Sequence, residues 1–150
     1  MSPTLADTFI RQFDGFDERL RKAVDGLDAN ALDRVVAPET NSIAVLVAHT
    51  TGSQLGWLHL AAGRDFKRDR DAEFRTRQQS AADLRALIDR AAAATPGLVR
   101  AAIDGGLETV RRRRDDNEEL TAGYSLIHAL EHVAEHVGQI ELTRQLVTRG

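Results

Sequence analysis

The sequence predicts an all-α protein folded as a four-helix bundle. Only three prolines interrupt 150 residues that are rich in strong helix formers such as Ala, Leu, Arg and Glu. Apolar residues recur every three to four positions in four long segments, which is the spacing of a buried helical face. The length suits a single domain over residues 1–150, able to bury roughly two thirds of its unfolded-chain surface. Four amphipathic helices in one domain favour a bundle.

The first helix is expected to begin with Ser2 as its cap and Pro3 at the first helical position. It should end within residues 25–28, where Asp and Gly weaken the helical pattern. A connector over residues 28–40 follows, and we expect it to hold one short helical turn. The stripe that supports the first helix comprises Leu5, Phe9, Phe13, Phe16, Leu20, Val24 and Leu27.

Asn41 or Ser42 caps the second predicted helix, which ends at Gly63. The next segment, residues 64–79, is polar and shows little periodicity, so it is interpreted as a long linker. A linker of this length allows a crossover between the second and third helices. Simple up-down-up-down order is therefore not the only arrangement that the sequence permits.

Ser80 and Asp83 resemble a capping pair at the start of the third helix, over residues 82–103. Pro96 should kink or interrupt this helix near Ala94, because it removes a backbone donor and clashes one turn back. The pair of glycines at 105–106 then ends it.

The segment before the last helix carries the strongest local charge. Arginines fill positions 111–114 and acidic residues follow within 115–119, so the two signs cancel and a solvated loop is expected. A brief extended stretch is expected around residues 108–112. Thr121 then caps the last helix, which runs to about Thr148.

Composition excludes several classes of function. The chain has no cysteine, so a metal site must use histidine, carboxylate or water, and a reducing cytoplasm is the expected location. A net charge of −3 with both signs interspersed gives no basis for binding nucleic acid or a membrane surface. The first residues carry no signal-peptide pattern, and the apolar runs are too short for a membrane span.

Three of the five histidines, His128, His132 and His136, lie four residues apart in LIHALEHVAEHVGQI. Neighbours at this spacing have Cβ atoms roughly 6 Å apart on one helix face, so an adjacent pair can bind one ion. The outer two are separated by about 12 Å along the axis and cannot share it. A further ligand must come from another helix.

His49 is a candidate for that ligand, because it lies mid-helix beside the small residues Gly52, Ser53 and Gly56. Two histidines of the last helix and His49 would form a three-histidine site with open coordination positions, as catalytic metals require. The alternatives are a core histidine bonded to a carbonyl and a merely polar histidine flank.

Both HALEH and HVAEH also fit the H-x-x-E-H pattern of inverted zincins, with Glu131 or Glu135 as the general base. We reject this interpretation, because so short a chain lacks room for a peptidase cleft. The two glutamates are expected to face solvent, and the alternative for Glu135 is to support a metal ligand.

Three ordered segments, NSIAVLVAHTTGSQLGWL, GRDFKRDRDAEF and HALEHVAEHVGQIELTRQL, resemble the DinB/YfiT-like superfamily. The resemblance covers essentially the whole chain. It implies a bundle with up-down-down-up topology and a long crossover between the second and third helices. It also implies a divalent metal, nickel or zinc, held by His49, His132 and His136, and a homodimer. His128 matches a histidine that lines the pocket or supports the ligands.

Relatives in this superfamily include transferases and an isomerase that use low-molecular-weight thiols of the mycothiol or bacillithiol type. The resemblance therefore implies a metal-dependent, thiol-dependent reaction on a small electrophile. The alternative is a non-enzymatic metal-binding or stress-response protein that forms dimers. Gln139 is a further candidate for the pocket, and Trp57 is expected in the core or a dimer contact. The linker residues Arg68, Asp69, Arg70 and Glu73 could position the end of the bundle or a substrate, and structural pairing is preferred to catalysis as their role.

Overall fold

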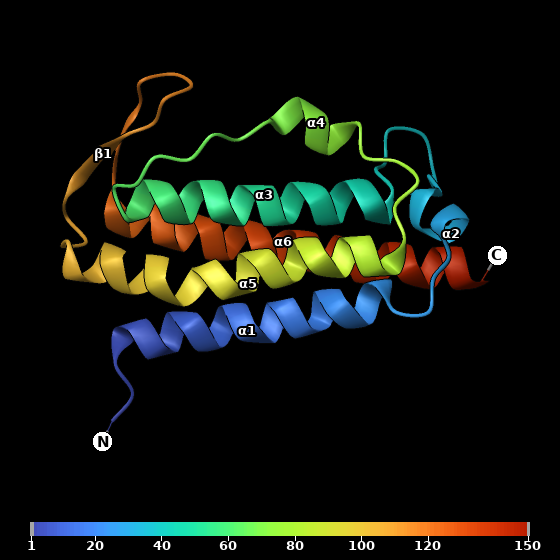
Figure 1. Ribbon diagram of the computed structural model, residues 1–150, viewed down its shortest axis with the longest axis horizontal. Helices are drawn as coiled ribbons and strands as arrows, with labels where there is room; N and C mark the ends of the chain where they lie inside the picture. The colour runs from blue at the N-terminus through green and yellow to red at the C-terminus, as the bar shows by residue number, and fades with distance from the viewer. Residues whose placement is uncertain (1, 150) are drawn as a thin grey trace.

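The computed structural model describes residues 2–149 and confirms the predicted helical bundle. Four long helices run side by side along the molecule (Figure 1). They are α1 (Leu5–Val24), α3 (Ile43–Ala61), α5 (Ala81–Asp104) and α6 (Ala122–Arg149). Two short helices, α2 (Ala29–Asp33) and α4 (Arg70–Phe74), lie in the connections. No helix within residues 2–149 is both long and apolar enough to cross a membrane.

The topology is up-down-down-up. In Figure 1, α1 and α6 run in one direction, whereas α3 and α5 run in the other. Because α3 and α5 are parallel, the linker between them must return along the whole bundle, and it carries α4 on the way (Figure 1). The helix α3 packs against both α5 and α6, and α1 packs against the same two helices from the opposite side.

The helix α3 is buried on nearly all sides. Its residues from Ile43 to Thr51 are all buried, and no single face carries the apolar ones. The returning linker explains this, because α4 covers the side of α3 that the other long helices leave open. This cover places polar linker residues over the middle of α3.

Local sequence signals predicted some of the helix N-caps correctly. Ser42 caps α3, and Ser80 forms a capping box with Asp83 at the start of α5, as predicted. The expected cap at Ser2 is wrong. Thr4 caps α1 instead, because its side chain accepts from Asp7 while the Asp7 carboxylate accepts the Thr4 backbone N–H, which satisfies two donors at once.

Two other expectations need correction. The expected interruption of the third long helix near Ala94 is wrong, because α5 continues through Pro96. Packing of α5 against α1 and α3 outweighs the lost backbone bond. The charged segment is not a plain loop. Its strands β1 (Val110–Arg112) and β2 (Glu119–Thr121) form an antiparallel hairpin, with Val110 opposite Thr121. The extended stretch around 108–112 was thus predicted, but its partner strand was not.

Candidate metal centre

Three histidines from two helices converge in the middle of the bundle. His49 of α3 and His132 and His136 of α6 each offer a ring nitrogen, and these atoms lie within 4.8 Å of one another. His49 is buried, whereas His132 and His136 are half-buried. Three ring nitrogens this close together can bind a single transition-metal ion.

The two histidines of α6 face each other one helical turn apart. Their Nε2 atoms are separated by 3.2 Å, and the ring of His49 lies about equally far from both, at centroid distances of 5.1 and 5.0 Å. His128 is not part of this group. Its ring centroid lies 6.0 Å from that of His132 and only 4.2 Å from that of Trp57, so it packs beside the cluster.

His49 is held by a carboxylate from the linker. Its Nδ1 lies 3.0 Å from Oε2 of Glu73, and Glu73 in turn accepts two hydrogen bonds of 2.7 Å from Arg68. An ionised carboxylate only accepts, so Nδ1 of His49 carries the proton and its Nε2 keeps a free lone pair. Metal-binding histidines are commonly oriented in this way by a carboxylate.

Two glycines of α3 make room for this arrangement. A Cβ atom on Gly52 would lie 2.1 Å from Oε1 of Glu73, and one on Gly56 would touch the Arg68 side chain at 3.4 Å. The first separation is impossible for real atoms. Glycine at position 52 is therefore required for Glu73 to approach His49 across the helix surface.

A second polar partner orients His136. Its Nδ1 lies 2.7 Å from Oε1 of Gln139, one turn further along α6. The amide oxygen accepts from the Nδ1 proton and leaves Nε2 of His136 with its lone pair. Nδ1 of His132 is buried and has no hydrogen-bond partner among residues 2–149.

The protonation states favour a metal over a proton. Burial, followed by the neighbouring His136 and His49, lowers the pKa of His132 to about 3. Burial also lowers the pKa of His136, although the bond to Gln139 opposes it. Burial alone would raise the pKa of Glu73, but hydrogen bonds from Arg68 and His49 outweigh this and lower it. His132 and His136 are thus neutral, and Glu73 is charged, at neutral pH.

This donor set fits a divalent transition metal. Neutral imidazole binds zinc, nickel, copper and iron, and three imidazoles leave coordination positions open. His49 and His136 have the tautomer that presents Nε2 to an ion. The Nε2 atom of His132 faces that of His136. The three histidines could therefore hold one ion, with Glu73 and Gln139 as orienting partners.

Sequence reasoning located the three converging histidines and Gln139, but it did not pair Glu73 with His49. Structural pairing was the predicted role of Arg68 and Glu73, and the two do form an ion pair. No spacing rule connects positions 49 and 73, because the contact depends on the path of the linker. Glu131 and Glu135 are exposed, as expected.

Comparison with known proteins agrees with this architecture. The family model of the DinB superfamily matches residues 12–140. The chain belongs to the DinB superfamily. This match spans the predicted bundle from α1 into α6 and includes all three histidines. A search of curated proteins gave no match.

Two solved structures share the fold. One is a DinB-like protein from Bacillus cereus, with a TM-score of 0.71 and 16% identity over 91% of this chain and 89% of that one. Another is a conserved protein from Enterococcus faecalis, with a TM-score of 0.68 and 17% identity over 99% of this chain and 100% of that one. At this identity the likeness concerns the fold alone.

Proposed function

We propose that this DinB superfamily member is a metal-dependent transferase that uses a low-molecular-weight thiol on a small electrophile. The observation that carries the proposal is the convergence of His49, His132 and His136 with their metal-binding nitrogens close together. A closed structural site would use four protein ligands, whereas this set provides three. The remaining positions suit an exchangeable ligand.

The ion would be nickel or zinc. When bound, it would supply a Lewis acid that lowers the pKa of a coordinated thiol and so favours the nucleophilic thiolate at neutral pH. The chain has no cysteine, so the thiol has to come from a cosubstrate of the mycothiol or bacillithiol type. The protein's own part is to hold the donors in place and to provide space for the two substrates.

The supporting residues perform that first task. Glu73 keeps the proton of His49 on Nδ1, and Gln139 does the same for His136. Burial keeps the His132 ring in its neutral form, so the ring does not have to lose the proton of an imidazolium before it binds metal. The site is therefore preorganised, which lowers the cost of assembling it around an ion.

Consumption of thiol tests the proposal. Purified protein is loaded with nickel or zinc and incubated with mycothiol or bacillithiol and a panel of small electrophiles, and free thiol is followed over time. We expect metal-dependent loss of thiol that is abolished in His132→Ala and His136→Ala. The matched control is His59→Ala, since His59 lies on α3 outside the cluster and bonds to the Leu55 carbonyl. Activity that survives in the first two variants excludes the mechanism.

A second candidate is a non-enzymatic, dimeric metal-binding protein. Its support is a pair of exposed leucines on α6, Leu142 and Leu146, which lie one turn apart and are 57% and 49% exposed. Leucines exposed in neighbouring positions suit a contact between two copies. Under this alternative the protein binds metal and dimerises, Leu142→Glu gives monomers, and no electrophile in the panel consumes thiol.

A further inference from the structure

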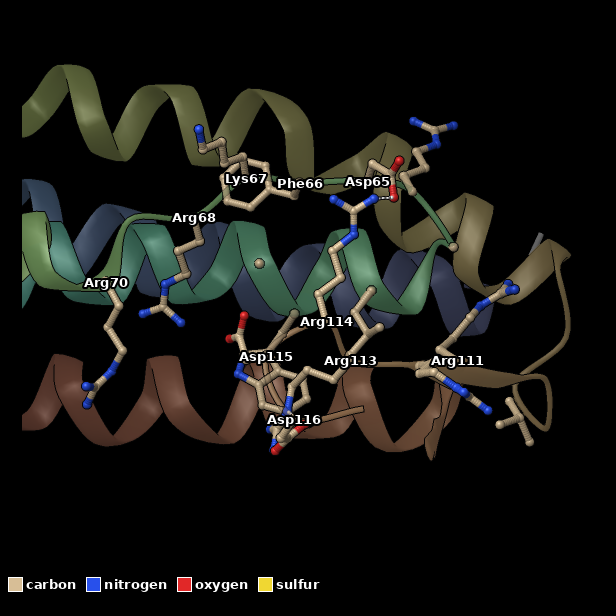
Figure 2. A pocket seen from close by; sticks show the side chains of 17 residues that line it. Asp65, Phe66, Lys67, Arg68, Arg70, Arg111, Arg113, Arg114, Asp115 and Asp116 are labelled. Carbon is tan, nitrogen blue, oxygen red and sulfur yellow. Dashed lines mark hydrogen bonds and ion pairs between the residues drawn. The ribbon is translucent and has the colours of Figure 1, made fainter. Parts of the chain in front are cut away.

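A pocket of about 680 Å³ lies next to the candidate metal centre, between the linker and the hairpin. Its floor is formed by the last part of α3, from Gly56 to Leu60, and by Gly63 just after it. Residues 64–68 and 70 of the linker line one side, and residues 110–116 of the hairpin line the opposite side. Figure 2 shows Arg68 and Arg70 on the linker side and Arg111, Arg113 and Arg114 on the hairpin side. Its volume lies within the range of small-molecule sites.

The lining is strongly basic, although the chain as a whole carries a net charge of −3. Three acidic side chains line the pocket, Asp65, Asp115 and Asp116. Eight basic ones do so, Arg64, Lys67, Arg68, Arg70, Arg111, Arg112, Arg113 and Arg114. Eight of the chain's 20 lysines and arginines thus surround one pocket, and a concave site lined by one sign of charge attracts the opposite sign.

Half of these cations are not neutralised by the protein. Arg68, Arg112, Arg113 and Arg114 form ion pairs with carboxylates. The other four form no ion pair among residues 2–149. They are Arg64, Lys67, Arg70 and Arg111. Charges left unpaired around a concave surface are available to a ligand of opposite charge.

The pocket shares a wall with the metal centre. The Arg68 guanidinium lines the pocket and also lies 3.2 Å from Nδ1 of His49. Arg70 stacks over Phe74 at 4.8 Å, and the Phe74 ring packs against His49 at the same centroid distance. A group bound by these cations would therefore lie beside the candidate ligands of the ion.

We propose that this pocket binds a small organic anion, a molecule with carboxylate or phosphate groups, and holds it beside the metal centre. Arginine recognises both kinds of group through paired N–H donors. The part of this inference that makes the bound anion a substrate or cosubstrate rests on the proposed function. The binding itself depends only on the charges of the pocket and can be measured without metal.

The only tryptophan of the chain provides the signal for the test. Trp57 lines the pocket, and the Arg113 guanidinium lies over its ring at 5.3 Å. Its fluorescence is titrated with succinate, with inorganic phosphate and with neutral succinamide, all at constant ionic strength. We expect saturable changes with the anions and none with succinamide. The tighter-binding anion identifies carboxylate or phosphate as the preferred group.

Matched charge variants locate the binding. Arg70→Gln/Arg114→Gln removes one exposed cation from each side of the pocket, and we expect anion binding to weaken about tenfold or more. Lys22→Gln/Arg85→Gln removes the same charge from exposed positions outside the pocket lining and should bind anions like the wild type. Equal weakening in both double variants, or a response that never saturates, would overturn the proposal. Circular dichroism confirms that each variant is folded.

The same titration separates this inference from the proposed function. It is repeated on His136→Ala, which lacks one candidate metal ligand. Saturable anion binding in His136→Ala shows that the pocket acts without the metal centre. If the wild-type protein binds anions saturably but neither holds metal nor consumes thiol, the pocket is supported and the transferase is rejected. Metal binding and thiol consumption without saturable anion binding reject the pocket alone.

Discussion

Glu73 accepts a hydrogen bond from Nδ1 of His49 across a distance of 3.0 Å, although the two residues belong to different elements of the chain. The contact depends on the linker lying along α3, and Arg68 donates to both oxygens of the same carboxylate. The metal centre is thus supported by a segment that contributes no ligand to it.

Glu73→Gln should weaken metal binding by about 10- to 100-fold, because loss of a carboxylate that orients a ligand histidine typically has this effect. The dissociation constant is measured by competition with a chromogenic chelator. Glu18→Gln is the matched control, since Glu18 is exposed on α1 and forms no ion pair within the described residues. Equal affinities for Glu73→Gln and the wild type would show that Glu73 does not orient His49.

Gly52→Ala should weaken metal binding, as Glu73→Gln does, although it changes none of the candidate ligands. The new Cβ would lie 2.1 Å from Oε1 of Glu73, so Glu73 has to move away from His49. Gly97→Ala is the control in α5, where a Cβ meets no other group within 4 Å. That variant should be more stable to urea by roughly 0.5–1 kcal/mol and should keep its metal affinity. Wild-type affinity in Gly52→Ala would contradict the steric argument.

Asp17 gives the fold a dependence on pH. It is 1% exposed, and neither of its carboxyl oxygens has a hydrogen-bond partner in the described part of the chain. Burial raises the pKa of Asp17 to about 7, although Arg21 opposes the shift. The folded protein therefore holds a proton that the unfolded chain, with a carboxyl pKa of 3.8, releases earlier. Stability consequently falls as the pH rises from about 4 to about 7.

Asp17→Asn should remove this slope, which amounts to at most about 4 kcal/mol across the window. The free energy of unfolding in urea is measured for both proteins at about pH 5 and about pH 8. Histidines with a lowered pKa, such as His132, contribute the opposite slope, but they are present in both proteins and cancel in the difference. Parallel profiles for the two proteins would show that Asp17 is not buried in its protonated form.

Features of the structure that depend on local or periodic signals could be predicted from the sequence. Apolar spacing located the four long helices, and helix geometry selected an adjacent pair among the histidines of α6. Short polar signals such as Ser80 with Asp83 placed a helix start. Each of these signals lies within a few residues of the feature that it specifies.

Features that depend on the path of the linker could not be predicted from such local signals. The short helix α4 and the contact between Glu73 and His49 arise only when a polar segment lies over α3. The cationic pocket likewise joins two segments that are distant in the sequence, residues 64–70 and 110–116. The arginines at 111–114 were expected to be cancelled by their acidic neighbours, but the hairpin places them opposite further cations of the linker.

The most direct test of the central claim is the metal content of tag-free protein, measured by inductively coupled plasma mass spectrometry. His49, His132 and His136 should together retain a single first-row transition ion per chain, and His49→Ala should lose it while His59→Ala keeps it. Protein without bound metal after loading and gel filtration, or His49→Ala with an unchanged metal content, would contradict the account.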